Sequence, residues 1–306
     1  MPETMPETLR RELPATPWMN RCAVMGIVNV TPDSFSSDGL AGSAQAASDQ
    51  GLVDRAVAQA ADFIEHGAEI LDIGGESTRP GAAPVPAAEE MDRVVPVVAA
   101  IAKHFPDTLI SVDTYKASVA RAALDAGAHI INDVWAGRAD EDMLPLMAES
   151  GVPVVLMHNK ARWGVATQDA KLGGSYEAPQ YGDFMQDILS EMREMAKSAE
   201  DAGVPSDLII LDPGVGFGKT LDQNLTLIRD LGAIRELGYP VLLGPSRKSF
   251  IGKVLDVEPG GRVMGTAASV SVGVAKGADI VRVHDVRAMT EVVRMTEAIL
   301  NSGREA

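Results

Sequence analysis

The 306-residue sequence contains little cysteine, few aromatic residues and no long apolar run. Cys22 is the single cysteine, which excludes an internal disulfide and is consistent with a reducing cytoplasm. No stretch approaches the roughly 18 consecutive apolar residues that indicate a membrane-spanning helix, so we expect no membrane partner. Positive charge is also scarce, since 27 Lys and Arg residues against 43 Asp and Glu give a net charge of −16. This charge argues against nucleic acid as a partner, and any anionic ligand needs a local cluster of cations.

The first twenty residues, "MPETMPETLRRELPATPWMN", carry charges and prolines but no apolar segment of the kind found in secretory signals. We therefore expect residues 1–20 to be a flexible N-terminal extension. The whole chain is 46% apolar, which is enough for the remaining residues, 21–306, to bury one large core. We expect them to form a single domain.

Eight short apolar runs rich in β-branched residues recur along the chain. Continuous apolar character is what a parallel strand needs when both of its faces are covered. The runs lie at residues 22–28, 69–73, 108–112, 129–131, 152–157, 207–211, 239–243 and 278–283. Six of them follow a glycine that would end the preceding helix, in "EHGAEI", "DAGAHI", "ESGVPV", "DAGVPS", "ELGYPV" and "AKGADI".

These repeated strand and helix units predict a single-domain (β/α)8 TIM barrel, with a doubly wound open sheet as the alternative. The longest gap between two apolar runs, residues 158–206, begins with a polar, glycine-containing stretch. We interpret this stretch as a mobile loop over the barrel mouth, followed by an acidic helix at about residues 183–202.

The segment "DPGVGFGKT", residues 212–220, looks like a phosphate-binding loop of nucleotide triphosphatases. That loop needs a glycine where this chain has Pro213, and proline has no N–H group to offer a phosphate. The dinucleotide-binding pattern G-x-G-x-x-G fails as well, because the glycines here are spaced G-x-G-x-G. The function of this turn must therefore come from its neighbours.

In a barrel of this kind the active site lies at the carboxyl ends of the strands. There, Asp113, Asn132 and Asp212 could bind a flat, nitrogen-rich heterocycle through paired N–H contacts. Met157 and Phe217 could pack against the faces of such a ring. Other polar side chains near these ends could bind phosphate or pyrophosphate, namely Asn29, Arg79, Lys248, Arg282 and His284. The site thus suits a polar ring with an anionic tail.

Each of these residues also has an ordinary structural explanation. Asp113 could cap the helix that follows it, and Arg282 could form a salt bridge at the rim. Met157 could belong to the core, and His158 and His284 could be structural, since no pair has zinc-ligand spacing. The convergence of so many polar residues on one face of the barrel favours a functional site.

Long motifs at these strand ends resemble those of dihydropteroate synthases, the folate-pathway transferases that sulfonamides inhibit. The likeness extends from about residue 23 to residue 297. It rests on "MGIVNVTPDSFSSDG" (25–39), "LDIGGESTRPGA" (71–82), "SVDTYKASVA" (111–120), "INDV" (131–134), "LDPGVGFGKT" (211–220), "LLGPSRKSFIG" (242–252), "GTAA" (265–268) and "GADIVRVHDV" (277–286).

The resemblance implies an enzyme that joins 6-hydroxymethyl-7,8-dihydropterin pyrophosphate to p-aminobenzoate through a pterin methylene cation, with Mg²⁺ as cofactor. It assigns pterin binding to Asp113, Asn132, Met157, Asp212, Phe217, Gly244 and Lys248. It assigns pyrophosphate binding to Asn29, Arg79, Arg282 and His284, with Asn29 also contacting the metal. It assigns the p-aminobenzoate or sulfonamide region to Phe35, Thr78, Arg79, Pro80, Lys248 and Ser249. Catalytic roles fall to Asp212, Lys248, Arg282 and His284.

The resemblance also implies a homodimer formed through the late helices, near residues 268–275 and 291–300. The first loop reads "SFSSDGL" where the family usually has SFSDGG, so Ser37 or Asp38 could take the position of the family's aspartate. The loop after the fifth strand, "HNKARWGVATQ", departs as well. Whether the protein is a sulfonamide-sensitive or a drug-tolerant form stays open.

Two other functions are compatible with the predicted barrel fold. A pterin-binding methyltransferase domain would not need the "TPDSF" and "STRPG" loops, so their presence counts against it. A non-catalytic pterin-binding relative would differ only in lacking turnover.

Overall fold

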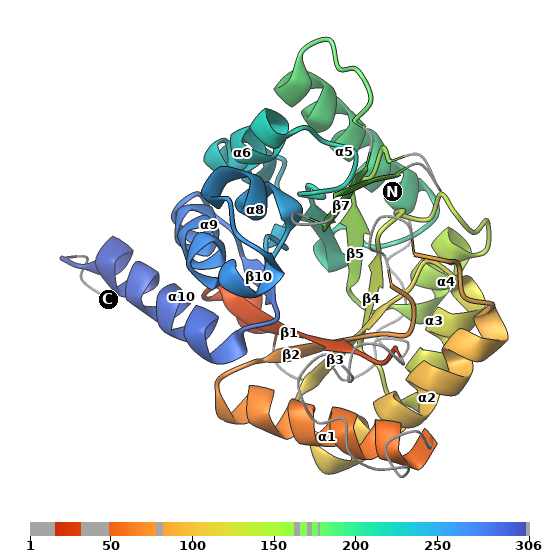
Figure 1. The fold of residues 1–306 in the computed structure, drawn as a ribbon. Helices are drawn as coiled ribbons and strands as arrows, with labels where there is room; N and C mark the ends of the chain where they lie inside the picture. Colours follow the sequence, from red (N-terminus) through yellow and green to blue (C-terminus); the bar gives the residue numbers. More distant parts are fainter. Residues whose placement is uncertain are drawn as a thin grey trace.

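Eight parallel strands form the centre of the molecule and close into a barrel (Figure 1). The structure is a computed structural model, which describes residues 16–31, 49–77, 82–161, 166–169, 173–176 and 178–303. The barrel strands are β1 (Ala23–Asn29), β2 (Ile70–Gly74), β3 (Leu109–Asp113), β4 (Ile130–Asp133), β5 (Val154–Met157), β8 (Ile209–Asp212), β9 (Leu242–Leu243) and β10 (Ile280–Val283). Each of the eight predicted runs contains or overlaps one of them.

The strands are hydrogen-bonded in the order β8-β5-β4-β3-β2-β1-β10-β9. A parallel bridge between Leu211 and Val241 joins the two ends of this order, next to β8 and β9. The predicted (β/α)8 barrel is therefore confirmed, and the alternative of an open sheet is excluded.

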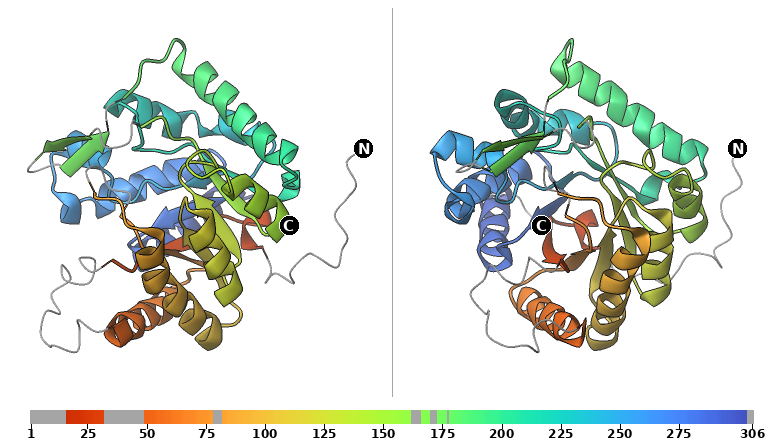
Figure 2. Two further views of the ribbon diagram at one scale, coloured as in Figure 1. Left: turned by 90° about the vertical axis from the view of Figure 1, so that its right-hand side faces the viewer. Right: turned by 45° about the vertical axis from the view of Figure 1, so that its right-hand side comes forward.

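The helices surround the barrel and cover the outer face of its strands (Figures 1 and 2). They are α1 (Asp49–Glu65), α2 (Ala87–His104), α3 (Ala117–Ala126), α4 (Met143–Ser150), α5 (Phe184–Asp201), α6 (Leu221–Arg229), α7 (Leu231–Arg235), α8 (Ser249–Leu255), α9 (Val263–Ala275) and α10 (Val286–Asn301). Short 3₁₀ turns lie at Pro17–Met19, Ser206–Leu208 and Pro259–Gly261.

The glycines predicted to end helices before strands all adopt positive φ angles, which side chains with a Cβ disfavour. They are Gly67, Gly127, Gly151, Gly203, Gly238 and Gly277. This backbone geometry turns each helix back toward the next strand, so the local sequence signal accounts for much of the repeated architecture.

The barrel strands have two buried faces. The outward-facing residues pack against the helices in the larger hydrophobic core. The inward-facing residues form a separate apolar layer inside the barrel, made by Ala23, Met25, Ile70, Leu109, Ile130, Val155, Ile210, Leu242 and Ile280. Because side chains alternate along a strand, the next inward-facing position on each strand lies one layer closer to the mouth.

Trp18 belongs to this inner layer and is 5% exposed. It lies just before β1, so it covers the end of the barrel where the strands begin. The described part of the expected N-terminal extension, residues 16–20, therefore includes a side chain of the barrel core. Residues 1–15 lie outside the described part of the chain.

The segment after β5 contains an antiparallel hairpin where we expected only a mobile loop. Its strands are β6 (Ala166–Asp169) and β7 (Gly173–Tyr176), and β7 contacts α8 (Figure 2). Hairpin pairing supplies the backbone hydrogen bonds that a polar loop would leave to water. The helix expected at about 183–202 is confirmed as α5.

Within the described residues, no helix is long and apolar enough to cross a membrane. Cys22 is a free, buried thiol at the start of β1. Burial and the nearby carboxylate of Glu297 raise the pKa of this thiol far above its usual range, so it is unreactive as a nucleophile. The cytoplasmic location expected from the cysteine content stays a prediction.

Candidate active site

Polar side chains collect at the carboxyl ends of the barrel strands, above the apolar inner layer. Asn29, Asp113, Met157 and Asp212 end their strands, Asn132 precedes the last residue of β4, and Arg282 lies within β10. The segments after β8, β9 and β10 contribute Phe217, Gly244, Lys248 and His284, and Ser249 begins α8. Phe35, Ser37, Asp38, Thr78, Arg79 and Pro80 lie outside the described residues, so their expected roles stay predictions.

Arg282 joins two buried carboxylates that both lie far from it in the sequence. Its Nε donates to Asp72 Oδ2 at 2.5 Å, and its Nη2 donates to Asp113 Oδ2 at 2.6 Å. Burial alone would lower the pKa of this guanidinium, but the charges of the two carboxylates raise it above its usual range. Arg282 is therefore a permanent cation inside the barrel mouth, and its expected contact with pyrophosphate stays a prediction.

Asp113 has one carboxylate oxygen without a partner. Its Oδ1 is buried and accepts no hydrogen bond from the described residues, whereas Oδ2 is paired with Arg282. Burial raises the pKa of Asp113 to about 7, although the charge of Arg282 opposes this shift. An orphaned, buried acceptor of this kind is costly unless a ligand donates to it.

Asn132 faces the same space from the neighbouring strand. Its Nδ2 donates to both oxygens of Asp72, at 3.3 and 3.2 Å. With the amide nitrogen held in this way, the carbonyl oxygen of Asn132 is turned away from Asp72 and can accept an N–H group.

Asp212 shapes the glycine-rich turn that follows it. Its Oδ1 accepts a hydrogen bond from the backbone N–H of Gly214 at 2.7 Å, and burial raises its pKa while the charge of Lys248 opposes the shift. Gly214, Gly216 and Gly218 all have positive φ angles. A Cβ on Gly214 would lie 2.0 Å from the carbonyl oxygen of His158, so only glycine fits. The glycines therefore bring this turn close to the end of β5.

The lysine of the apparent phosphate-binding motif points into its own turn. The Nζ of Lys219 donates to the carbonyl oxygens of Gly214 at 3.0 Å and Phe217 at 2.9 Å, and also to His158 O at 3.2 Å. Its side chain is buried, and burial lowers its pKa to about 7. Lys219 thus holds the turn in shape and presents no charge to a phosphate, which agrees with the exclusion of a nucleotide site.

His158 connects this turn to α5. Its Nε2 lies 2.8 Å from Glu191 Oε2, and its Nδ1 lies 3.2 Å from the Nζ of Lys219. Burial and the charge of Lys219 lower the pKa of His158 to about 3, so the imidazole is neutral. It therefore donates from Nε2 to Glu191, and its unprotonated Nδ1 shares one Lys219 proton with the carbonyl oxygen of His158. The structural explanation offered for His158 is thereby supported.

Lys248 extends over the turn from the opposite side. Its Nζ donates to the carbonyl oxygen of Val215 and lies over the ring of Phe217. Burial lowers the pKa of this ammonium to about 8, while Asp212 opposes the shift. Gly244 borders the same space, since a Cβ there would lie 3.9 Å from the Nζ of Lys248. Lys248 thus brings a partly desolvated cation to the pocket that Asp212 borders.

His284 is oriented by Ser246. The Ser246 hydroxyl accepts from the backbone N–H of His284 at 3.1 Å and lies 3.0 Å from its Nδ1. These two contacts of one hydroxyl fix the orientation of the imidazole relative to the backbone of β10. Arg247, with a positive φ angle, forms a bidentate ion pair with Asp285 beside them.

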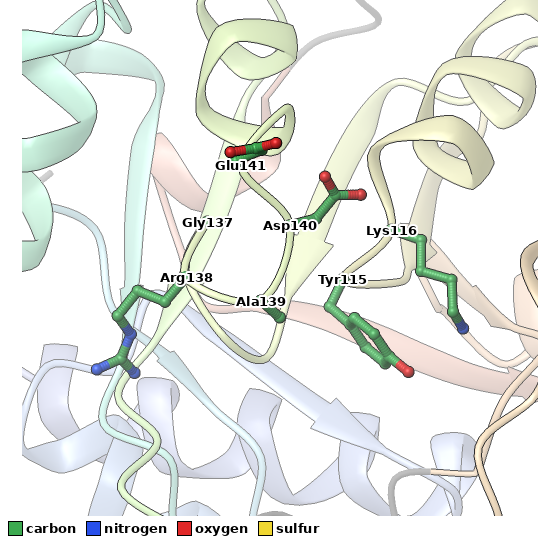
Figure 3. Close-up of a pocket in the computed structure, with 7 residues that line it drawn as sticks. All are labelled: Tyr115, Lys116, Gly137, Arg138, Ala139, Asp140 and Glu141. Atoms are coloured by element: carbon green, nitrogen blue, oxygen red, sulfur yellow. The ribbon is translucent and has the colours of Figure 1, made fainter.

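A second group of charges lies beside the mouth, between the segments that follow β2 and β3. The Nζ of Lys116 bridges the carboxylates of Glu76 and Glu90, and the hydroxyl of Tyr115 donates to Glu76 at 3.1 Å. Figure 3 shows an open pocket that Tyr115 and Lys116 line together with residues 137–141. Both side-chain tips point away from residues 137–141 in this view, in agreement with their bonds to Glu76. This group therefore anchors the segment at the end of β2.

The roles of Asp72 and Lys219 were not predicted from the sequence. Asp72 was missed because we considered strand ends only, yet a carboxylate inside the apolar run "EILDI" is itself a signal. Lys219 was considered only as part of a phosphate-binding pattern that the chain does not satisfy.

Comparisons with known proteins agree with this geometry. The model of the family "Pterin binding enzyme" matches residues 25–284. The dihydropteroate synthase of Bacillus subtilis is 47% identical over 289 residues, which cover 94% of this chain and 92% of that protein.

Two solved structures are also similar. The dihydropteroate synthase of Clostridium difficile, crystallised in the presence of pteroic acid, is 44% identical with a TM-score of 0.80, covering 92% of this chain and 97% of that one. The dihydropteroate synthase of Xanthomonas albilineans with 4-aminobenzoic acid is 41% identical with a TM-score of 0.81, covering 92% and 94%. The chain therefore belongs to the pterin binding enzyme family and, within it, to the dihydropteroate synthases, which are transferases.

Proposed function

We propose that this chain condenses 6-hydroxymethyl-7,8-dihydropterin pyrophosphate with p-aminobenzoate, forming 7,8-dihydropteroate and pyrophosphate. The observation that carries the proposal is the buried Oδ1 of Asp113, which lacks a hydrogen-bond donor among the described residues. It lies in the mouth that Asn132 and Asp212 also border, and a pterin ring offers N–H donors to all three. The relatives solved with pteroic acid and 4-aminobenzoic acid support the two substrate classes.

The pterin ring binds between the carboxylates and the glycine-rich turn. Asp113 and Asp212 accept ring N–H groups, and Asn132 accepts through the carbonyl oxygen that its contact with Asp72 leaves available. Met157, which is 2% exposed, and Phe217 supply apolar surface against the ring. Lys248 donates to an acceptor on the ring and exchanges its contact with Val215 O for that bond.

The reaction proceeds by loss of pyrophosphate before the amine attacks. The C–O bond between the pterin methylene carbon and pyrophosphate breaks, and the electron pair leaves with pyrophosphate. The resulting cation spreads into the ring, where the Asp212 carboxylate stabilises it. The arylamine nitrogen then forms the C–N bond and loses one proton. No side chain of the barrel needs to act as a nucleophile.

Arg282 and His284 bind the leaving pyrophosphate at the end of β10. Arg282 keeps its positive charge at every working pH, and Ser246 holds the imidazole of His284 in a fixed orientation beside it. These groups stabilise the charge that develops on the leaving oxygen. Binding and charge stabilisation are thus the main contributions of these residues.

Asn29 suits a magnesium ion that is held mainly by the substrate. Its amide oxygen is a hard ligand, and Mg²⁺ in phosphate sites keeps several waters and takes only one or two protein ligands. The described residues contain no cluster of three or more His, Cys, Asp or Glu that could form a protein cage for a metal. When bound, Mg²⁺ supplies neutralisation of the pyrophosphate charge.

Pyrophosphate release tests the proposal directly. Purified protein is supplied with Mg²⁺ and the pterin pyrophosphate, with and without p-aminobenzoate, and the products are separated. We expect pyrophosphate release that depends on p-aminobenzoate, with one dihydropteroate formed per pyrophosphate. A sulfonamide titration then distinguishes a sensitive form from a tolerant one. Tight pterin binding with no release would instead identify a non-catalytic pterin-binding relative.

We also propose that the protein is a homodimer that pairs through α9 and α10. These helices pack against each other on the outside of the barrel (Figure 1). Their outer surface exposes Met264, Val272, Met295, Ile299 and Leu300. Met264 is 76% exposed and Met295 and Ile299 are each 61% exposed, so this surface gains apolar burial when a second copy covers it.

A further inference from the structure

Asp72 is a fully buried carboxylate inside the barrel, on the inward face of β2. It follows Ile70 by two residues, so it lies one layer above the apolar inner layer to which Ile70 belongs. Its exposure is 0%, and isolated charges are very unfavourable in such surroundings. A group with this cost needs a function that an apolar residue of similar size would not fulfil.

The contacts of Asp72 join two residues that the proposed function places on the substrate. Arg282, 210 positions later in the chain, donates to its Oδ2 at 2.5 Å. Asn132, 60 positions later, donates to both of its oxygens. Asp72 therefore fixes the plane of the guanidinium and the rotation of the amide at the same time.

Neutralising Arg282 does not by itself explain Asp72, because Asp113 already provides a carboxylate at 2.6 Å. A second buried carboxylate adds its own desolvation cost. Asp113, however, must offer its oxygens to a ligand, whereas Asp72 lies one layer deeper. Asp72 can thus keep Arg282 in place when Asp113 is engaged.

We propose that Asp72 is a positioning residue. It orients Arg282 toward the pyrophosphate and the carbonyl oxygen of Asn132 toward the pterin, and does not itself touch the substrate. This proposal rests on the proposed function for the identity of the ligand. It predicts a defect in pterin pyrophosphate recognition that is larger than the defect in p-aminobenzoate recognition.

The test is Asp72→Asn, which keeps the shape of the side chain and removes its charge. The amide nitrogen that this substitution introduces would be a donor and not an acceptor, so Arg282 and Asn132 would have to share one neutral oxygen in place of a carboxylate. We expect KM for the pterin pyrophosphate to rise about tenfold or more and kcat to fall, while KM for p-aminobenzoate changes by less than about threefold. Calorimetric binding of the pterin pyrophosphate alone should weaken by a similar factor.

Asp133→Asn is the matched control, since Asp133 is also 0% exposed and adjoins the same site on β4. Its Oδ1 accepts from the backbone N–H of Trp135 and its Oδ2 from that of Gly137, both in its own loop, where the backbone of Ala136 also contributes. We expect this variant to lower Tm without a comparable change in KM for the pterin pyrophosphate. The comparison separates positioning from the general cost of altering a buried carboxylate.

The pH profile gives a readout that a structural role would not change. The charged groups facing Asp113 are Arg282, which lowers its pKa, and Asp72, Glu90 and Asp133, which raise it. Asp72→Asn removes the largest of the raising charges, so the acidic limb of kcat/KM should move to lower pH. Asp133→Asn should move it less.

A double-variant cycle with Asn132→Ala tests whether Asp72 acts through Asn132, and a melting curve of each variant verifies that the protein being measured is folded. If Asp72 acts through Asn132, the double variant loses less binding than the product of the two single losses. The proposal is overturned if Asp72→Asn lowers Tm but leaves KM for the pterin pyrophosphate and the acidic limb unchanged. A wild-type protein that binds the pterin without turnover would contradict the proposed function, and the binding comparison would still test Asp72.

Discussion

The ammonium nitrogen of Lys248 lies 4.7 Å from the centre of the Phe217 ring. A cation over an aromatic face is attracted by about 0.5 to 2 kcal/mol, more strongly when it is desolvated. The two side chains reach this position from different strand ends, and together they form one wall of the proposed pterin pocket. Changes at either residue should therefore affect pterin recognition in graded ways.

Lys248→Met should lower kcat/KM for the pterin pyrophosphate about 100-fold, because a charged hydrogen bond contributes about 1.5 to 3 kcal/mol. Folding should not suffer at pH 7. The pKa of Lys248 is lowered to about 8 by burial, so carrying the charge below that pH destabilises the folded state. Steady-state kinetics and a melting curve check both parts, and an unchanged kcat/KM would remove Lys248 from the site.

Phe217→Leu should raise KM for the pterin pyrophosphate about tenfold, because the aromatic face is lost to both the ring and Lys248. Phe217→Tyr keeps that face and serves as the control, with an expected change below about threefold. Equal effects of the two variants would show that packing volume, and not the aromatic face, matters here.

Asp113→Asn should separate stability from function. Burial raises the pKa of Asp113 in the folded protein to about 7, from 3.8 in the unfolded chain. Ionising this carboxyl therefore costs folding stability as the pH rises through that window. The Tm of the variant minus that of the wild type should be more positive at pH 8 than at pH 5.

Pterin binding should show the opposite preference, since the ionised Asp113 is the better acceptor. Wild-type affinity measured by calorimetry should increase between pH 6 and pH 8, to follow the pKa of about 7, while the variant stays weak throughout. A Tm difference that does not change with pH would contradict the raised pKa.

Gly214→Ala should destabilise the protein by about 3 kcal/mol or more, because a positive φ angle is combined with a contact of 2.0 Å to a backbone oxygen. Activity should also fall, since the turn that bonds to Asp212 must shift. Gly238→Ala is the control: it shares the positive φ angle, but its Cβ would meet nothing within 4 Å. We expect about 1 to 2 kcal/mol there and full activity, measured by urea unfolding and turnover.

Met295→Asp should convert the proposed homodimer to a monomer. Met295 lies on the exposed surface of α10, and a carboxylate at the centre of an apolar interface would be buried without a partner. Sedimentation should show half the mass of the wild type, with an unchanged far-UV spectrum. A wild-type protein that sediments as a monomer would contradict the dimer directly.

The features that the sequence predicted best are those encoded locally. Apolar runs and glycines such as Gly127 lie within a few residues of the structure they determine, so the strands and helix ends could be read from short segments. The strand-end residues followed from the same pattern, because the barrel fold fixes which end carries the site.

Most of the features that were missed depend on contacts between distant segments, and one of them lacks the usual local pattern. The partners of Arg282 lie 169 and 210 positions away, and no local pattern indicates which carboxylates it binds. Trp18 is similar: a short segment of mixed composition gives no sign that one side chain fills the barrel end. The β6–β7 hairpin was missed because its residues lack the alternation of apolar and polar side chains typical of strands.

The ring of strands is joined unevenly. β8 and β9 meet through the Leu211 and Val241 bridge, whereas β1 and β2 share five paired positions. Directly beyond this junction, β8 ends at Asp212 and β9 leads to Lys248. A pterin bound to both residues would connect the two edges of the sheet, so the substrate would act as a reversible cross-link that closes the barrel. Ligand binding should then slow backbone hydrogen exchange along β8 and β9 more than in the opposite half of the barrel.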